Sequence, residues 1–368
     1  MQQFKVPYVN FQHQFAESRE ETMAAIEAVM NRGDFILGKE VTEFENEFAK
    51  LCGVKHAIGV ANGTDSLIMC MRAIGIGPGD EVITTSNSWI SSASSIALIG
   101  AKPVFVDVAQ DQNMDPACLE KAITKKTKCI MPVHLTGRCA RMPEILAIAS
   151  KHGIPVLEDA AQAVGARVGN IRAGAGGLFS SFSLHPLKNL NATGDAGIIT
   201  TDDDEMARKL KMWRNHGMRN RDEIDFWGYN SRLDTVQAAV LLPRLRRLPE
   251  IIEKRRALAK QYVAGLSEVV QCPIERDDEF HTYHVFVIQC DKRNELQAHL
   301  LSRGIDTKIH YPIPIHLQKA AEGLGYKRGD LPVTEQQMSR ILSLPINQYL
   351  KSEQVDLVVE SIREFYRR

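Results

Sequence analysis

The apolar positions in the first half of the chain fall into two patterns that alternate along the sequence. Residues 17–31 and 40–52 place apolar side chains at helical spacing, and a glycine follows each segment within two residues. Short runs rich in β-branched residues come next, at 81–85, 103–108, 128–133 and 154–159. Helical stretches such as 65–74 and 142–152 separate these runs. Short apolar strands between helices predict an α/β fold with a parallel sheet covered on both faces.

The pattern changes after residue 170 and begins again near residue 275. Residues 170–200 combine a Gly-rich stretch with two short strands and a polar loop between them. Long helices are expected next, at 203–217, 232–247 and 250–268. Pro243 and Pro249 predict a hinge between the last two helices, because proline interrupts helical hydrogen bonding.

A second, shorter α/β pattern closes the chain. The expected elements are a strand at 283–290, a helix at 293–303, a strand at 306–311 and a helix at 353–367. These elements can form a sheet of their own, separate from the first one. We therefore predict a large domain over residues 1–249 and a smaller C-terminal α/β domain over residues 250–368.

Charge narrows the class of protein. Lys plus Arg and Asp plus Glu both number 45 in 368 residues, so the formal net charge is zero. This balance argues against a protein that binds along a nucleic acid or an anionic membrane. The basic segment 244–260 has its apolar residues on one helical face, which favours a solvated helix over a nucleic-acid site.

The cysteines and the apolar runs indicate in which cellular compartment the protein works. No apolar run approaches the roughly 18 residues that a spanning helix needs, and the N-terminus lacks a secretion pattern. Seven cysteines are spread along the chain without a C-x-x-C pair. Neither a disulfide framework nor a metal site is predicted, and we expect a cytoplasmic protein of enzyme size.

The segment SSFSLHPLKNLNATGDAG, residues 180–197, carries the most informative lysine. Lys188 lies in a polar loop between two apolar runs, five residues after Ser183 closes the first run. Most loop lysines are solvated and have no chemical role. A lysine at the mouth of a sheet can instead become a Schiff-base nucleophile, because desolvation or a nearby cation lowers its pKa.

Two further segments supply a carboxylate and a phosphate site. Asp159 ends an apolar strand, where it can cap a helix or face a cationic ligand atom at the sheet edge. Gln162 follows one turn later and would face the same cleft. Gly63 and Thr64 precede a helix, so free backbone N–H groups there can bind phosphate, although a simple helix cap explains them equally well.

A phosphate cup, a strand-end carboxylate and a loop lysine are the parts that pyridoxal 5′-phosphate needs. The lysine forms an imine with the cofactor, and the carboxylate keeps the pyridine nitrogen protonated. An aromatic side chain over the ring would complete the pocket. Trp89 follows the run at 81–85 and can take that place, although a core or interface tryptophan is an equal alternative.

Nine motifs in order resemble the nucleotide-sugar aminotransferases of the DegT/DnrJ/EryC1/StrS group, a branch of the aspartate-aminotransferase fold (fold type I). That fold has a large domain with a mostly parallel sheet of the seven-stranded type and a smaller C-terminal α/β domain. The resemblance runs nearly end to end. The motifs are FILGKEVTEFE (35–45), ANGTDSL (61–67), PVHLTG (132–137), EDAAQA (158–163), SFSLHPLKN (181–189), GDAG (194–197), RNHG (214–217), GYNSRLD (228–234) and IHYPIPIHLQ (309–318).

The resemblance implies roles around the cofactor ring. Lys188 would form the imine and later move the proton between the substrate carbon and the cofactor. Asp159 would pair with the pyridine nitrogen, and Gln162 with the phenolic oxygen of the ring. Trp89 occupies the position of the stacking aromatic residue.

The resemblance also implies how the phosphate is held and that the active unit is a homodimer. Gly63, Thr64 and Ser183 would hold the phosphate of the cofactor. Asn230 would reach the phosphate of the cofactor in the neighbouring subunit, so active sites would be shared across the interface. Thr136 and Asn191 depart from the family pattern, which often has tyrosine and glycine at these positions.

The expected substrate is a keto group at C3 or C4 of a nucleotide-linked sugar, with C3 favoured and L-glutamate as the amino donor. His310, Tyr311 and His316 lie in a Pro-punctuated loop that would border the sugar, and plain packing is an equal alternative for His316. Three other readings stay open: a sugar dehydratase, another enzyme that uses the same cofactor, and a non-catalytic regulatory relative. Lys188 favours aminotransfer, because histidine replaces this lysine in the dehydratases.

Overall fold

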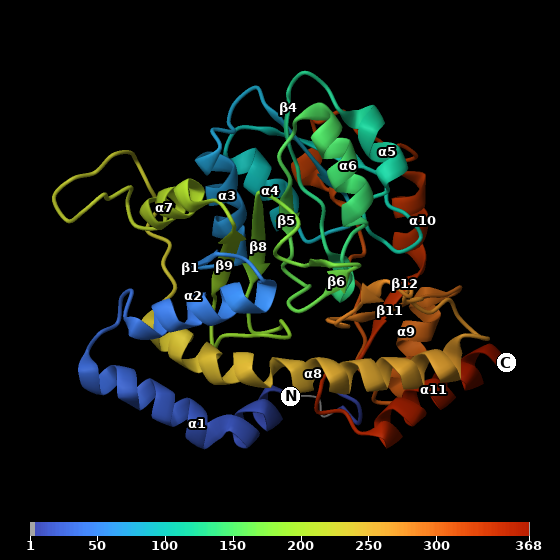
Figure 1. The fold of residues 1–368 in the computed structure, drawn as a ribbon. Coiled ribbons are helices and arrows are strands. Elements are labelled where there is room, and N and C mark those ends of the chain that lie inside the picture. Colours follow the sequence, from blue (N-terminus) through green and yellow to red (C-terminus); the bar gives the residue numbers. More distant parts are fainter. Residues whose placement is uncertain (1–3, 368) are drawn as a thin grey trace.

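A computed structural model describes residues 4–367 as a broad α/β body with long helices along its base (Figure 1). Two helices open the chain, α1 (Phe11–Arg32) and α2 (Lys39–Cys52). Gly33 and Gly53 follow them with φ of 71° and 77°, a left-handed conformation that glycine adopts without strain. Both helices were predicted, although α1 begins six residues earlier than its pattern indicated.

Seven strands form the large sheet. They are β1 (His56–Val60), β2 (Glu81–Thr85), β3 (Lys102–Val106), β4 (Thr127–Ile130), β5 (Leu157–Asp159), β8 (Phe179–Ser183) and β9 (Gly197–Thr201). The order β3-β2-β4 continues into β5-β8-β9-β1 through isolated parallel bridges between Ile130 and Val156 and between Val133 and Asp159. Only β9 runs antiparallel to its neighbours. The predicted mostly parallel sheet is confirmed.

Helices cover both faces of this sheet. They are α3 (Gly63–Ala73), α4 (Ser91–Leu98), α5 (Pro116–Ala122), α6 (Met142–His152) and α7 (Asp204–Trp213). Val82 and Ile83 are neighbours in β2 but belong to two different buried clusters, one on each face. Because successive strand residues point to opposite faces, a sheet buried on both sides needs continuous apolar runs. This requirement explains the strand pattern in the sequence.

A second core lies at the C-terminal end. Its elements are α8 (Thr235–Leu266), β11 (Phe286–Gln289), α9 (Arg293–Ser302), α10 (Pro332–Arg340), β12 (Ile341–Leu344) and α11 (Ser352–Arg367). Tyr262, Phe286 and Leu344 are fully buried in this cluster. A small sheet of β6 (Arg167–Val168), β7 (Ile171–Arg172) and β10 (Glu279–Phe280) packs against the first core. No helix in the described part of the chain is both long and apolar enough to cross a membrane.

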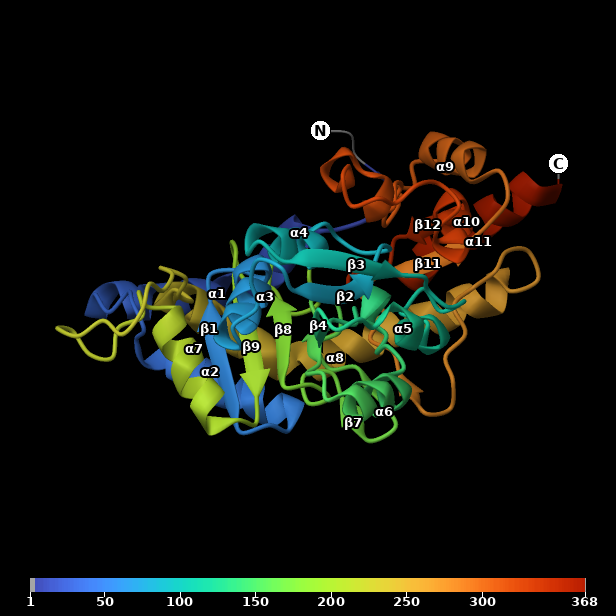
Figure 2. The ribbon, with the colours of Figure 1, turned by 90° about the horizontal axis from the view of Figure 1, so that it is seen from above.

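The predicted hinge between two helices is wrong. One helix, α8, runs without a break through Pro243 and Pro249 along the base of the molecule (Figures 1 and 2). It packs against α2 and α1 near its start and against α11 near its end. Tertiary packing on several helices outweighs the local cost of proline. The boundary at 249/250 stays a prediction, and the buried residues of α8 pass from the first core to the second between Ile252 and Leu258.

The predicted strand at 306–311 is also wrong. Within this segment only Lys308 forms a bridge, with Ser343, while the partner of β11 is β12. The segment 341–344, Ile-Leu-Ser-Leu, directly follows a helix and has no turn before it, so no separate strand signal marks it.

Candidate active site

Asp159 lies at the carboxyl end of β5, fully enclosed by the sheet and α4. Its Oδ2 accepts a hydrogen bond from Ser92 Oγ at 2.6 Å, and its Oδ1 accepts one from the N–H of Ala161 at 3.3 Å. Because Ser92 donates its hydroxyl proton to Asp159, it must accept from Ser88, whose Oγ lies 2.7 Å from Ser92 Oγ. Burial raises the pKa of Asp159 above its usual value, because the charged form loses its water. The hydroxyl chain holds the carboxylate in one orientation.

Lys188 faces this carboxylate from the loop between β8 and β9. Its backbone N–H donates to the carbonyl of His185 at 2.9 Å, which closes a turn after β8. Among the residues described, none hydrogen-bonds to Nζ. Desolvation lowers the pKa of Lys188 to about 8, against the opposing attraction of Asp159. The amine is therefore in substantial part neutral near pH 8, as a nucleophile requires.

The predicted phosphate residues come together at the start of α3. A Cβ atom on Gly63 would lie 2.9 Å from Cβ of Ser183, so only glycine allows this approach of helix and strand. The side chain of Asn62 caps α3 by accepting from the N–H of Asp65 at 2.8 Å. Thr64 Oγ1 and Ser91 Oγ are 2.8 Å apart. The first N–H groups of α3 lack helical partners and, with these hydroxyls, suit a phosphate.

Gln162, Trp89 and Tyr311 gather on one side of the site. Gln162 Oε1 accepts from the N–H of Thr136 at 2.8 Å, and its Nε2 donates to Tyr311 Oη at 3.3 Å. The rings of Trp89 and Tyr311 are tilted, with centroids 5.7 Å apart. Trp89 is 57% exposed, which fits a side chain that covers a ligand better than a core residue. Three segments distant in sequence thus form one wall.

The two histidines of the 309–318 loop have different surroundings. His310 Nδ1 lies 2.8 Å from Ser343 Oγ, and burial lowers the pKa of His310 to about 4, with Lys188 adding to the effect. His316 has both ring nitrogens occupied, by Ser86 at 2.7 Å and Glu335 at 3.2 Å. This geometry favours the packing alternative for His316. A substrate role for either histidine stays a prediction.

Asn230 lies on the segment that follows α7 and projects from the body (Figure 1). It forms a backbone bridge with Asn215, and its side chain is exposed. The next residue, Ser231, donates to Asp65 Oδ2 at 2.7 Å, which ties this segment to the first turn of α3. The role of Asn230 in a neighbouring subunit stays a prediction.

A buried pair behind Asp159 escaped the sequence analysis. His134 Nδ1 accepts from the N–H of Ala140 at 3.1 Å, so its proton is on Nε2 and is donated to Glu158 at 2.7 Å. Burial would raise the pKa of Glu158, but the hydrogen bonds from His134 and from Ser180 hold it below its usual value. Glu158 precedes Asp159 directly, so this anchored carboxylate fixes the end of β5. Its polar position within an apolar strand was the signal available.

These residues fit the cofactor of the resemblance, pyridoxal 5′-phosphate. Lys188 offers an amine without a hydrogen-bond partner in the described chain. Asp159 offers a desolvated carboxylate, and the start of α3 next to Ser183 offers donors for a phosphate. Gln162, Trp89 and Tyr311 would line the space between them. Which atoms each residue contacts in the cofactor stays a prediction.

Comparison with known proteins agrees with this site. The chain belongs to the DegT/DnrJ/EryC1/StrS aminotransferase family, whose profile matches residues 16–363. A pleiotropic regulatory protein of Geobacillus stearothermophilus is 45% identical, and the match covers 98% of this chain and 99% of that protein. A dTDP-3-amino-3,4,6-trideoxy-α-D-glucose transaminase of Streptomyces venezuelae is 42% identical, with coverage of 99% and 97%.

Solved structures confirm the fold. The crystal structure of S. venezuelae DesV in complex with a ketimine intermediate has a TM-score of 0.97 and 42% identity, with coverage of 99% of both chains. The predictions of family, fold class and cofactor are confirmed: the protein is a pyridoxal-phosphate-dependent aminotransferase.

Proposed function

We propose that this protein transfers an amino group from L-glutamate to a keto group of a nucleotide-linked sugar. The observation that carries the proposal is the Lys188 amine, with a pKa near 8, opposite the buried Asp159 carboxylate. The family membership of the chain supports the reaction type. The name of the Streptomyces relative supports the sugar substrate.

Lys188 and Asp159 would divide the acid–base work. The bound cofactor supplies a ring that stabilises negative charge on the carbon that loses its proton. Lys188 can accept a proton at Nζ and return it to a neighbouring atom, because its pKa lies near the working pH. Asp159, held by Ser92 and Ala161, would keep a proton on the ring nitrogen. Trp89 and Tyr311 would exclude water from one side of the site.

We further propose that the amino group is transferred to C3 of the sugar. The Streptomyces relative carries a 3-amino sugar in its name. His310 and Tyr311 lie next to the proposed ring wall, beside Lys188 and Trp89, where a sugar carbon must approach. We expect the product of a 3-keto nucleotide sugar to carry its amine at C3. Turnover of a 4-keto sugar alone would place the amine at C4 instead.

The deciding experiment follows the absorbance of the cofactor-loaded protein as L-glutamate is added without a sugar. We expect the band of the bound aldehyde form to be lost and about one 2-oxoglutarate to appear per subunit, since the first half-reaction consumes one cofactor. Lys188→Ala should abolish both changes. Lys211→Ala, an exposed lysine on α7, is the matched control and should behave as the wild type.

The remaining readings correspond to other outcomes of the same experiment. A stable band that ignores glutamate would contradict the donor and favour the dehydratase or the non-catalytic regulatory relative. Glutamate turnover with simple oxo acids, but with no keto sugar, would favour another aminotransferase. Loss of the band followed by amination of a keto sugar would support the proposal in full.

We also propose that the protein works as a homodimer in the cytoplasm. Large apolar side chains are exposed along α1 and on the segment after α7, namely Phe11, Phe15, Met23, Met30, Ile224 and Trp227. Apolar exposure on this scale is typical of a surface that a second subunit covers. Asn230 lies on the same projecting segment, as the shared active site requires.

A further inference from the structure

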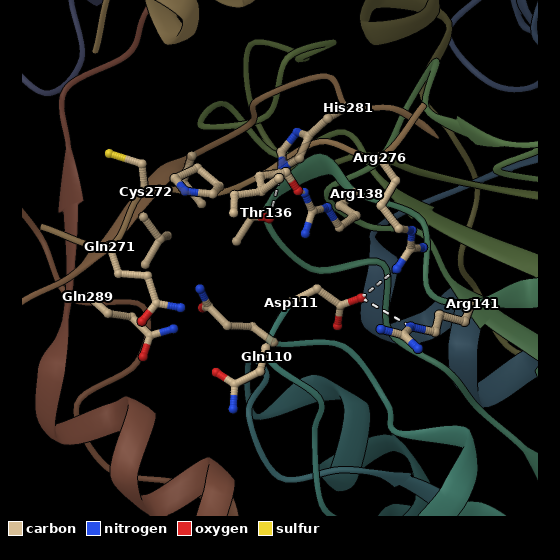
Figure 3. A pocket seen from close by; sticks show the side chains of 15 residues that line it. Gln110, Asp111, Thr136, Arg138, Arg141, Gln271, Cys272, Arg276, His281 and Gln289 are labelled. Carbon is tan, nitrogen blue, oxygen red and sulfur yellow. Dashed lines mark hydrogen bonds and ion pairs between the residues drawn. The ribbon is translucent and has the colours of Figure 1, made fainter. Parts of the chain in front are cut away.

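A cavity of about 210 Å³ lies apart from Lys188, between the loop after β3 and the strand β11 (Figure 3). Residues 110–112 and 136–141 form one side, and residues 271–276, with His281 and Gln289, form the other. Lys188, Asp159 and Ser183 do not line it. The cavity thus lies between a loop region of the large domain and a segment of the C-terminal part, and it is separate from the space assigned to the cofactor.

The charge on its wall is mainly positive. Arg138, Arg141 and Arg276 line the cavity, and Asp111 is the one carboxylate among the lining residues. Asp111 Oδ2 lies 3.5 Å from Arg141 Nε and 3.3 Å from Arg276 Nη1 (Figure 3). Glu279, behind the wall, pairs with Arg138 at 3.4 Å and with Arg276 at 2.5 Å. Asp278, an exposed residue, lies 3.6 Å from Arg276 Nε. Three carboxylates, two of them buried, therefore surround the three guanidinium groups, and all three contact Arg276.

Arg141 is the cation with unused donors. Within the described residues, the single interaction of its side chain is the long contact from Nε to Asp111. Neither terminal nitrogen of Arg141 has a partner in the part of the chain that the structure covers. A guanidinium group presents five N–H donors in a planar fork that matches carboxylate or phosphate oxygens. The free N–H donors of Arg141 can therefore bind an anion in the cavity.

The part of the lining away from the arginines is neutral and polar, with glutamines from both sides of the cavity. Four side-chain amides line it, those of Gln110, Gln112, Gln271 and Gln289, and none of them has a hydrogen-bond partner among residues 4–367. Gln112 and Gln289 are both 7% exposed, and Oε1 of Gln112 is buried without a partner. Unsatisfied amides at buried positions are costly unless a ligand or water bonds to them.

Thr136 adds a donor and connects the cavity to the cofactor side. His281 Nδ1 accepts from the N–H of Tyr283 at 2.8 Å, so the ring proton is on Nε2 and points to Thr136 Oγ1 at 3.2 Å. The hydroxyl proton of Thr136 is then free for a ligand. Thr136 has a φ of 64°, which a β-branched residue rarely adopts, and its N–H holds Gln162.

We propose that this cavity binds a small organic anion, with its carboxylate or phosphate group at Arg141 and hydroxyl groups at the glutamines. An engineered cavity of about 150 Å³ holds one benzene molecule, so 210 Å³ admits a ligand somewhat larger than benzene. Pockets for drug-sized ligands measure roughly 300–1,000 Å³, so a nucleotide sugar does not fit here. The inference does not depend on the proposed sugar substrate.

Calorimetry on the cofactor-loaded protein tests the site with three probes of similar shape. Glycerol 3-phosphate and glycerate carry the two candidate anionic groups, and glycerol carries neither. We expect one or both anions to bind and glycerol not to bind. Arg141→Gln should weaken anion binding about tenfold or more, as expected for a lost charge-assisted hydrogen bond. Gln110→Ala, an exposed side chain without partners, should weaken it by a smaller factor.

Arg303→Gln is the matched control, because Arg303 is similarly exposed (40% against 38% for Arg141), forms an ion pair and follows α9 outside the cavity lining. It should bind the anions as the wild type does. Equal binding by Arg141→Gln and the wild type would place the anion elsewhere, for example at the phosphate cup, and would overturn the proposal. So would the absence of binding by both anions, or equal binding of glycerol. Binding of one anion alone identifies the acidic group.

Discussion

At the scale of single residues, the site depends on how burial sets the charge of two groups. Lys188 and Asp159 each lose solvation, which lowers the pKa of the amine and raises that of the carboxyl group. Their mutual attraction opposes both shifts. Ser92 and Ser88 add no charge, but they fix the direction of the carboxylate. A small hydroxyl chain thus decides where the functional carboxylate points.

The pH dependence of Lys188 follows from this balance. In the cofactor-free protein, the rate of amine acylation should rise with pH and reach half its maximum near pH 8, because the neutral amine is the reactive form. Asp159 raises the pKa of Lys188, so Asp159→Asn should move the midpoint to lower pH. Mass spectrometry of the peptide that contains Lys188 measures the rate. A midpoint above pH 10 in the wild type would show that the amine is solvated.

At the scale of elements, α8 shows how packing overrides a local signal. Pro249 lies on the exposed side of the helix, and the N–H that a helix would use at this position is missing. The helix continues because Leu245, Leu248 and Ile252 are buried in the first core. Pro332, by contrast, stands in the first turn of α10, where a free N–H has no helical partner.

Replacement of Pro249 should therefore stabilise the protein. Pro249→Ala restores one helical hydrogen bond, and we expect a gain of about 1–2 kcal/mol in the free energy of unfolding, less than the full proline cost because the unfolded chain becomes more flexible. Pro332→Ala should not raise the free energy of unfolding, because a backbone N–H in the first turn of a helix has no helical partner. Urea titration of both variants measures the difference. An equal change in the free energy of unfolding of the two variants would mean that Pro249 does not destabilise α8.

At the scale of the whole molecule, the buried clusters on the two faces of the large sheet, the C-terminal core and one continuous helix hold the parts of the site in place. Asp159 ends a strand of the large sheet and Lys188 lies in a loop between two of its strands, whereas His310 and Tyr311 come from the C-terminal part. The cavity near Arg141 lies on the boundary between the same two parts. The segment after α7 projects from the body (Figure 1), and Asn230 lies at its base, where it bridges to Asn215.

Subunit mixing tests whether active sites are shared. Lys188→Ala and Asn230→Asp should each impair the protein, the second because its carboxylate repels the cofactor phosphate. If Asn230 serves the neighbouring subunit, each mixed dimer contains one intact site of two, so purified mixed dimers should have about half of wild-type activity. Co-expression with two affinity tags isolates the mixed dimers for assay. Activity at the mean of the two parent variants would show that each subunit builds its site alone.

Local sequence alone determined the family and most strands of the large sheet, although β1 was not predicted, and it proposed the main chemical groups. The β2 strand and the α6 helix occupy the predicted residues, because their periodicity and flanking turns are local features. Lys188, Asp159 and Gly63 were identified by motifs a few residues long. The structure places Gly63 against Ser183 and Lys188 opposite Asp159, as a shared site requires.

Only the tertiary structure decided how distant segments meet. The pairing of Ser92 with Asp159, of His134 with Glu158, and of β11 with β12 joins residues 24 or more positions apart, and no local pattern encodes such contacts. The continuity of α8 depends on the helices packed along it. The cavity beside Arg141 exists because two segments more than a hundred residues apart leave space between polar side chains. Periodicity reports which face of an element is buried, but only the packed chain shows what that face contacts.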